Sequence, residues 1–164
     1  MGTNEELPEK ITGYEYLESA FPCLDSDGYV VTSLSNSQYN CIAHAAGDNT
    51  KRWDPTDFPK PGFYWPIGVP LEEGIDALVK VFESLGYDRC IGGELEPGWE
   101  KIALYADNYG MWQHAAKQLC DGSWSSKLGE LEDIKHPHPH SVSGPAYGKV
   151  VIYMKRARES SQET

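Results

Sequence analysis

The chain has 164 residues and a formal net charge of −11, with a sequence pI of about 4.8. This length predicts one domain with its own core, and the content of 40% hydrophobic and 12% aromatic residues is typical of a globular protein. The negative charge argues against a nucleic-acid or anionic-membrane partner, because phosphate would be repelled. We therefore expect a protein, peptide or small-molecule partner.

The sequence shows no membrane or export segment. No apolar run approaches the roughly 18 residues of a membrane span, and residues 1–13 carry no hydrophobic signal segment. The cysteines are widely spaced and form no CxxC pair; they are Cys23, Cys41, Cys90 and Cys120. We predict free thiols in a reducing cytoplasm, and two disulfides are the alternative if an export signal has been trimmed away.

The N-terminal quarter contains turns and a first strand. Residues 1–13 are polar and predicted to be a flexible N-terminus, followed by a single domain over 14–155. Tyr14 to Phe21 fits a short helix or an extended edge. Residues 22–28 are rich in turn-forming side chains and precede a predicted strand over 29–32.

A short helix is predicted to carry Cys41. The run CIAHAA over 41–46 is compatible with a helix, and Gly47 is a natural residue just past its end. Three residues before the run can cap it, namely Ser35, Asn36 and Ser37. Cys41 then lies in or near the first helical turn, and His44 lies on the same face.

The middle of the chain alternates loop and helix. Residues 53–70 are rich in proline and aromatic side chains and are predicted to form a packed loop. Leu71 to Leu85 has one apolar stripe and ends at Gly86, which predicts an amphipathic helix of the core. Tyr87 to Glu96 fits a strand or a loop.

The second half of the chain is predicted to be a series of strands over 101–107, 111–119, 123–128 and 147–155, before a flexible tail over 156–164. The sequence therefore predicts an α+β fold in which two principal helices pack on an antiparallel sheet of about five strands.

Three residues predict a thiol active site. A thiol at a helix start gains from the helix dipole and from unpaired amide donors, and a strand histidine can take its proton. Cys41 is the candidate nucleophile, His114 the candidate base and Asp133 the candidate orienting group. If 111–119 and 123–128 form a hairpin, Ser126 or Lys127 lies nearer the ring, and Lys127 is then a plausible anion binder.

The rest of the proposed site comes from the neighbourhood of Cys41. Helix amides with Gln38 or Asn40 would stabilise an oxyanion. The aromatic loop with Trp53 and Trp65 would form the wall of the substrate groove. This mechanism needs no cofactor and no metal.

Other interpretations of the same residues remain open. Cys41 and His114 can each be buried structural residues. A zinc site from Cys41 and His44, with His114 or His136, is a second alternative. The tract His136, His138 and His140 is separated by prolines and is more typical of adventitious metal binding. A third alternative is a non-catalytic binding module whose aromatic loop forms the docking surface.

Five segments resemble a family of uncharacterised small bacterial proteins that is common in cyanobacteria. The resemblance covers roughly residues 36–155, and its segments are 39–43 (YNCIA), 100–105 (EKIALY), 114–119 (HAAKQL), 124–129 (WSSKLG) and 133–136 (DIKH). Because that family is a domain of unknown function, the resemblance implies no activity.

The order helix cysteine, strand histidine, polar residue is similar, more distantly, to papain-like hydrolases. This resemblance implies a papain-like fold with Cys41 as nucleophile, His114 as general base and Asp133 as orienter. Ser35 stands near the place of the papain-type oxyanion glutamine, and Gln38 is the glutamine within reach. We therefore expect a papain-like thiol hydrolase that cleaves an amide, isopeptide or related acyl bond.

Overall fold

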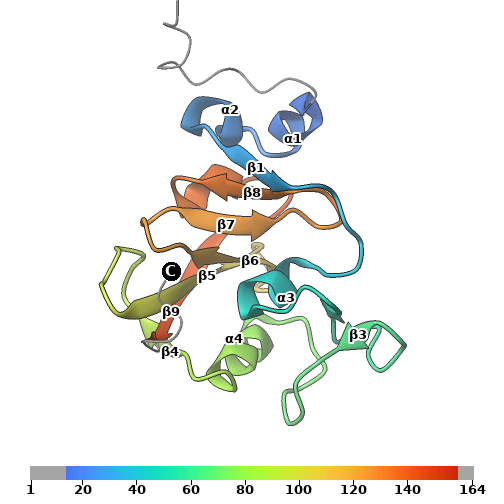
Figure 1. Cartoon of the computed structure of the whole chain (residues 1–164). Coiled ribbons are helices and arrows are strands. Elements are labelled where there is room, and N and C mark those ends of the chain that lie inside the picture. Colours follow the sequence, from blue (N-terminus) through green and yellow to red (C-terminus); the bar gives the residue numbers. More distant parts are fainter. Residues whose placement is uncertain (1–13, 159–164) are drawn as a thin grey trace, which may run out of the picture.

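The computed structural model describes residues 14–158 and is built around a single large antiparallel sheet (Figure 1). Its strand order is β1-β8-β7-β6-β5-β9-β4. The strands are β1 Val30–Ser33, β4 Asp88–Cys90, β5 Trp99–Ala106, β6 Trp112–Gln118, β7 Trp124–Lys127, β8 Asp133–His136 and β9 Lys149–Ala157. A separate parallel pair is formed by β2 Arg52–Trp53 and β3 Phe63–Tyr64.

Five short helices surround this sheet. They are α1 Glu15–Ala20, α2 Cys23–Asp27, α3 Cys41–Ala46, α4 Ile75–Glu83 and the 3₁₀ helix η2 Pro139–Val142. In Figure 1, α1 and α2 lie at the β1 end of the sheet, α3 lies beside the central strands β6 and β7, and α4 lies towards the β4 end. Between residues 14 and 158, no helix has the length and apolar character needed to cross a membrane.

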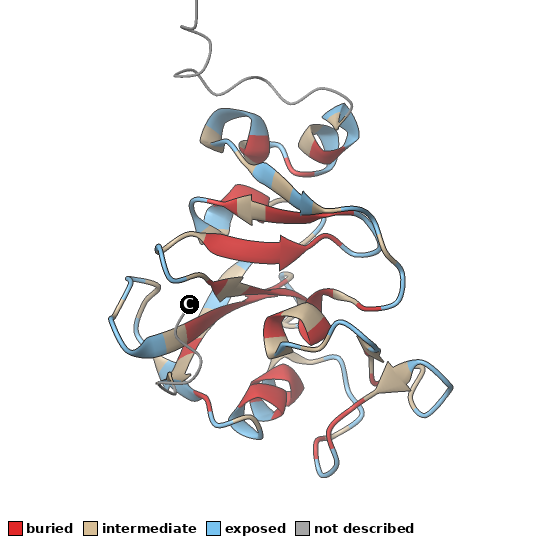
Figure 2. Cartoon of the chain, in the orientation of Figure 1, coloured by how far each residue is buried: buried red, intermediate tan, exposed pale blue. Residues whose placement is uncertain are grey.

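The two faces of the sheet carry separate cores because strand side chains alternate between faces. On β5, Ile102 and Leu104 pack with α3 and α4, and we call this side the α3 face. Ala103 and Tyr105 point the other way and pack with α1, α2 and η2 on the α1 face. Figure 2 shows the central strands as largely buried between these layers.

The sequence predicted the fold class, and the structure confirms an α+β fold with an antiparallel sheet. The predicted strand number of about five is too low, because the sheet has seven strands. The extra strands are β4 and β8, which have only three and four residues and are too short for a clear alternating pattern. Strand β4 pairs with the nine-residue strand β9, and β8 pairs on its two sides with β7 and β1.

The ends of the chain differ in detail from the prediction. Residues 22–28, predicted as a turn, contain α2, whose Leu24 is fully buried. Strand β9 extends to Ala157 and so enters the predicted tail. The predicted flexible N-terminus, 1–13, and most of the predicted tail lie outside the described residues.

Candidate functional site

The start of α3 is fixed by the side chain of Asn40. Its Oδ1 accepts hydrogen bonds from the backbone N–H groups of Ala43 at 3.1 Å and Trp53 at 3.0 Å. Its Nδ2 donates to the carbonyl of Trp53 at 2.9 Å. This cap satisfies a free helix amide and ties α3 to β2. The Asn40 amide is therefore engaged in structure, although the sequence suggested it for an oxyanion.

Cys41 follows this cap, and its thiol is packed into the core of the α3 face. The residue is only 7% exposed. Burial raises the pKa of the thiol to about 11, although the nearby amide of Ala115 and the ammonium of Lys127 act in the opposite direction. At this pKa only about one thiol in ten thousand is ionised at pH 7. The thiol is therefore not activated.

His114 lies on the other side of the sheet from Cys41. Its ring stacks on Tyr147 with centroids 4.1 Å apart and contacts the edge of Tyr105, a residue of the α1-face core. Its Nε2 lies 2.9 Å from Oγ of Ser126, the neighbour expected from a hairpin of the two strands. The structure therefore does not bring Cys41 and His114 together.

His114 belongs to a buried chain of hydrogen bonds. His136 Nδ1 donates to the carbonyl of His138 at 2.8 Å, so its Nε2 must accept from Ser126 at 2.8 Å. The Ser126 hydroxyl then accepts from Nε2 of His114, whose Nδ1 is left without a partner. Burial lowers the pKa of His136 to about 4 and that of His114 well below its usual value. These neutral imidazoles hold the α1-face core together.

A different histidine meets the predicted polar residues on the α3 face. His44, three residues after Cys41, places Nε2 2.8 Å from Oγ of Ser125. Its Nδ1 lies 3.8 Å from Oδ2 of Asp133. The same carboxylate oxygen accepts a 2.7 Å hydrogen bond from the Tyr39 hydroxyl. A serine, a histidine and an aspartate thus stand in the order that acyl-transfer chemistry uses.

The electrostatics of His44 suit a base. Burial lowers its pKa below the usual value, and the Asp133 carboxylate opposes this shift only in part. The ring is therefore neutral at pH 7. When Nε2 accepts the Ser125 proton, Nδ1 carries hydrogen and faces Asp133. Neither His44 Nδ1 nor Asp133 Oδ1 has a hydrogen-bond partner within the described part of the chain.

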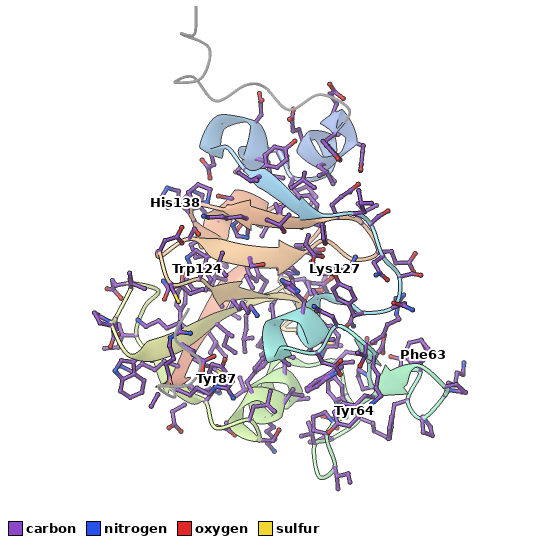
Figure 3. The ribbon with its side chains drawn as sticks, in the orientation of Figure 1. Phe63, Tyr64, Tyr87, Trp124, Lys127 and His138 are labelled. Carbon is purple, nitrogen blue, oxygen red and sulfur yellow. The ribbon has the colours of Figure 1, made fainter. Side chains whose placement is uncertain are left out.

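The side chains of Ser125 and His44 lie at the edge of the buried region. Ser125 is 8% exposed, and the His44 side chain is 12% exposed. Lys127, which Figure 3 labels, follows two residues later on β7. It therefore points to the same face as Ser125, but it is fully buried. Its Nζ donates to the carbonyl of Leu131 and lies 5.1 Å from the Tyr39 ring centroid. The predicted anion binder is thus already engaged within the protein.

The aromatic segment supports the core rather than forming the wall of a groove. Trp53 is buried and donates its Nε1 hydrogen to Asp48. Trp65 is 1% exposed, stacks near Trp112 and donates to a backbone carbonyl. Gln38 lies on the exposed connection before α3. We assign these residues no part in the chemistry of the His44–Ser125 pair. The sequence suggested the two tryptophans for substrate contact and Gln38 for an oxyanion.

A cleft of about 510 Å³ lies near the pair, although neither Ser125 nor His44 is among the residues that line it. Its walls include the end of α3, at Ala46 and Gly47, and the side chain of Lys117. Lys117 is the direct cross-strand partner of Ser125 in the β6–β7 pairing. Paired residues point to the same face of a sheet, so Lys117 connects the cleft to the strand that carries the serine.

No metal centre is evident among residues 14–158, where no group of three His, Cys, Asp or Glu side chains is placed to hold an ion. The residues of the zinc alternative are divided between the faces, with Cys41 and His44 on one and His114 and His136 on the other. His138 and His140 stack at 5.0 Å instead.

Sequence reasoning placed Asp133 in the site but missed Ser125 and the role of His44. His44 was noted only as a possible zinc ligand. Ser125 and Ser126 are adjacent, and they point to opposite faces of β7, so only the register of the sheet decides which serine meets which histidine. The signal that could have found the pair is the contact of α3 with both β6 and β7.

A family model described as a domain of unknown function (DUF7689) matches residues 30–155. This range includes all of the residues of the His44–Ser125–Asp133 cluster. No curated protein and no solved structure matches the chain.

Proposed function

The chain belongs to the DUF7689 family, a domain of unknown function, and we propose that it is a hydrolase of acyl bonds. The nucleophile is Ser125, the general base is His44, and Asp133 orients the imidazole. The observation that carries this proposal is the 2.8 Å contact between Ser125 Oγ and His44 Nε2. A nucleophile and its base need this hydrogen-bond distance.

The chemistry proceeds in two halves. In the first half, Ser125 Oγ attacks the carbonyl carbon while its proton moves to His44 Nε2. The tetrahedral intermediate then collapses, and the imidazolium returns that proton to the leaving amine or alcohol. In the second half, His44 takes a proton from water, which attacks the acyl-serine ester, and the carboxylic acid leaves as Ser125 regains its proton. The 3.8 Å separation from Asp133 must close for the imidazolium to be stabilised fully.

The papain-like interpretation contributes the class of bond, an amide, isopeptide or related acyl bond. Its thiol mechanism needs Cys41 and His114 on one side of the sheet, and they lie on opposite sides. The His44–Ser125 pair supplies a nucleophile and base without that requirement. We therefore transfer the proposed activity from the thiol to the serine.

A non-catalytic binding module is the second candidate function. The observation that favours it is the extent of burial, since Asp133 is 5% exposed and bonded to Tyr39. Satisfied polar networks of this kind also make cores rigid. In that case the cleft would bind a ligand, and Ser125 and His44 would only maintain the shape of its wall.

Site-resolved chemical labelling tests the proposal without a known substrate. A fluorophosphonate reacts with activated serines, and mass spectrometry identifies the residue labelled. We expect labelling of Ser125 in the wild type and its loss in His44→Ala. His140→Ala, at an exposed histidine, is the matched control and should keep the label.

Asp133→Asn tests the orienting role, because asparagine can still accept the hydrogen bond from Tyr39. We expect it to slow the labelling of Ser125 with little loss of stability. Labelling of Ser125 no faster than that of other serines, whatever stands at position 44, would overturn the hydrolase and leave the binding module.

A further inference from the structure

The cleft beside Ser125 collects positive charge on an acidic protein. Its lining includes Lys117, Arg156 and Arg158 and a single carboxylate, that of Glu100. Three cations against one anion leave a local excess of positive charge, whereas the whole chain carries −11. A cavity with this lining favours an anion, and low-dielectric walls strengthen that preference.

The three cationic side chains differ in how many contacts they make with other groups of the protein. Arg156 is held by Glu100 at 3.3 Å, by the carbonyl of Leu85 at 2.6 Å and by the ring of Tyr87 at 4.6 Å. Arg156 is thus positioned rigidly by these contacts. Arg158 makes one weak contact with a backbone carbonyl, at 3.4 Å.

The positive charge of Lys117 is not neutralised by a carboxylate within the described part of the chain. Its ammonium makes no ion pair with any residue between 14 and 158. The ammonium also lies near enough to His44 to contribute to the lowered pKa of that ring. Lys117 therefore joins the cleft to the proposed reactive pair.

The cleft continues into an apolar one of about 340 Å³. The two share Cys120 and Arg158, and the second is also lined by Leu95, Pro97 and Trp99. Its one carboxylate, Glu96, is neutralised by ion pairs with Lys101 and Lys155. Leu95 is 46% exposed and Trp99 37% exposed, so both offer apolar surface to this cleft. The combined groove thus has a cationic half beside Ser125 and an apolar half beyond Arg158.

We propose that this groove binds an organic oxyanion that carries an apolar group. The oxyanion is held by Lys117 and Arg158, and the apolar group lies against Leu95 and Trp99. This inference rests on the proposed function, because it assigns the substrate class of that hydrolase: an acyl compound with an acidic group and an apolar group near the bond that is cleaved. Guanidinium and ammonium groups bind carboxylate and phosphate oxygens through charge-assisted hydrogen bonds.

Cys120 provides a direct readout, since it is an exposed free thiol in the wall shared by both halves. The rate of its alkylation by iodoacetamide, a neutral reagent, is measured by mass spectrometry with Cys23, which is not in the groove, as internal reference. We expect 4-phenylbutyrate to slow alkylation of Cys120 but not of Cys23. The uncharged 4-phenylbutanol and the small anion acetate should each protect much less at the same concentration.

Variants locate the charge that matters. Lys117→Ala and Arg158→Ala should each raise the concentration of 4-phenylbutyrate that halves the alkylation rate of Cys120, by roughly tenfold. This factor corresponds to the loss of about one charge-assisted hydrogen bond. Lys60→Ala, at a surface lysine paired with Asp57 and outside both clefts, is the matched control and should not change it. Phenyl phosphate in place of phenylbutyrate shows whether phosphate or carboxylate is preferred. Equal protection by acid and alcohol, or protection by neither, would overturn the inference.

Ser125→Ala separates this inference from the hydrolase proposal. The variant lacks the nucleophile but keeps every groove residue, so protection of Cys120 should persist in it. Protection without fluorophosphonate labelling of Ser125 would support the groove and refute the hydrolase. Labelling without protection would support the hydrolase and refute this substrate class.

Discussion

The buried imidazoles of His114 and His136 make stability depend on pH at the level of single residues. Burial depresses the pKa of His136 from 6.5 to about 4. Between these values the unfolded chain binds a proton that the folded chain does not, so the folded state loses stability as the pH falls through this window. His136 alone should lower the free energy of unfolding by about 3 kcal/mol from pH 7 to pH 4, and His114 acts in the same direction.

Urea titrations at pH 7.5, 6.0 and 5.0 measure this loss. His136→Gln should be less stable at neutral pH, because it disturbs the bond to Ser126, but its stability should change less between pH 7.5 and 5.0. Lys60→Gln, at an exposed side chain far from these imidazoles in the sequence, should keep the wild-type slope. Identical slopes for all three proteins would contradict the assignment.

The thiol of Cys41 is expected to be inert in the folded protein. Its pKa of about 11 and its exposure of 7% both oppose attack on an alkylating reagent. Iodoacetamide at pH 7.5 should modify the exposed Cys120 at least about a hundredfold faster than Cys41, and denaturant should remove the difference. Rapid modification of Cys41 that depends on a histidine would restore the thiol mechanism.

At the scale of elements, the turn into β9 depends on a glycine. Gly148 has φ +69°, and a Cβ there would lie 2.1 Å from the carbonyl oxygen of Ala106 on β5. Gly98, with φ +87°, has open space at the same position. Gly148→Ala should therefore lower the unfolding free energy by about 3 kcal/mol or more, against about 1 kcal/mol for Gly98→Ala. Urea midpoints of the two variants make the comparison, and equal losses would count against the close β5–β9 contact.

Elements with a strong local signal could be predicted from the sequence. The apolar stripe within 71–85 predicted α4, which occupies Ile75–Glu83, and the helix signals around Cys41 predicted α3 at 41–46. Strand β8 could not be predicted in this way because it is short, and the segment that contains β4 fitted a strand or a loop equally well. Each of them pairs with a strand far along the chain, β8 with β1 and β4 with β9. The class of the fold was thus accessible, but the size of the sheet was not.

The candidate site was predictable only in part, and for a related reason. Asp133 was expected beside a histidine, and it is beside His44. His114 could be placed on a strand but not on a face of the sheet, since face depends on register and on where α3 packs. Ala115, the residue after His114 on β6, is the one that points toward Cys41, and His114 points to the opposite face.

At the scale of the whole molecule, the N-terminal helices belong to the folded domain. The family match begins at residue 30, after α1 and α2. Yet Leu17 and Leu24 on these helices are fully buried in the α1-face core. Leu24→Ala should cost about 3 kcal/mol, and removal of residues 1–28 should cost more. A truncated protein with the wild-type urea midpoint would show that the helices are dispensable.

The two faces of the sheet carry separate titrations, and the final prediction distinguishes them. Fluorophosphonate labelling of Ser125 needs neutral His44, whose pKa lies below 6.5. The rate should therefore be level around neutral pH and fall in acid as the imidazole gains its proton. Stability falls over a similar range because His136 and His114, on the α1 face, resist protonation.

His136→Gln separates the two effects because it changes the α1 face and leaves the contact between His44 and Ser125 in place. Labelling rates from pH 5 to 8 are measured with circular dichroism at each pH, so that only folded protein is compared. The fall in labelling should occur at the same pH in the variant and the wild type, although their stabilities differ. A fall that moves with the unfolding transition would show that loss of the fold, not protonation of His44, controls the serine.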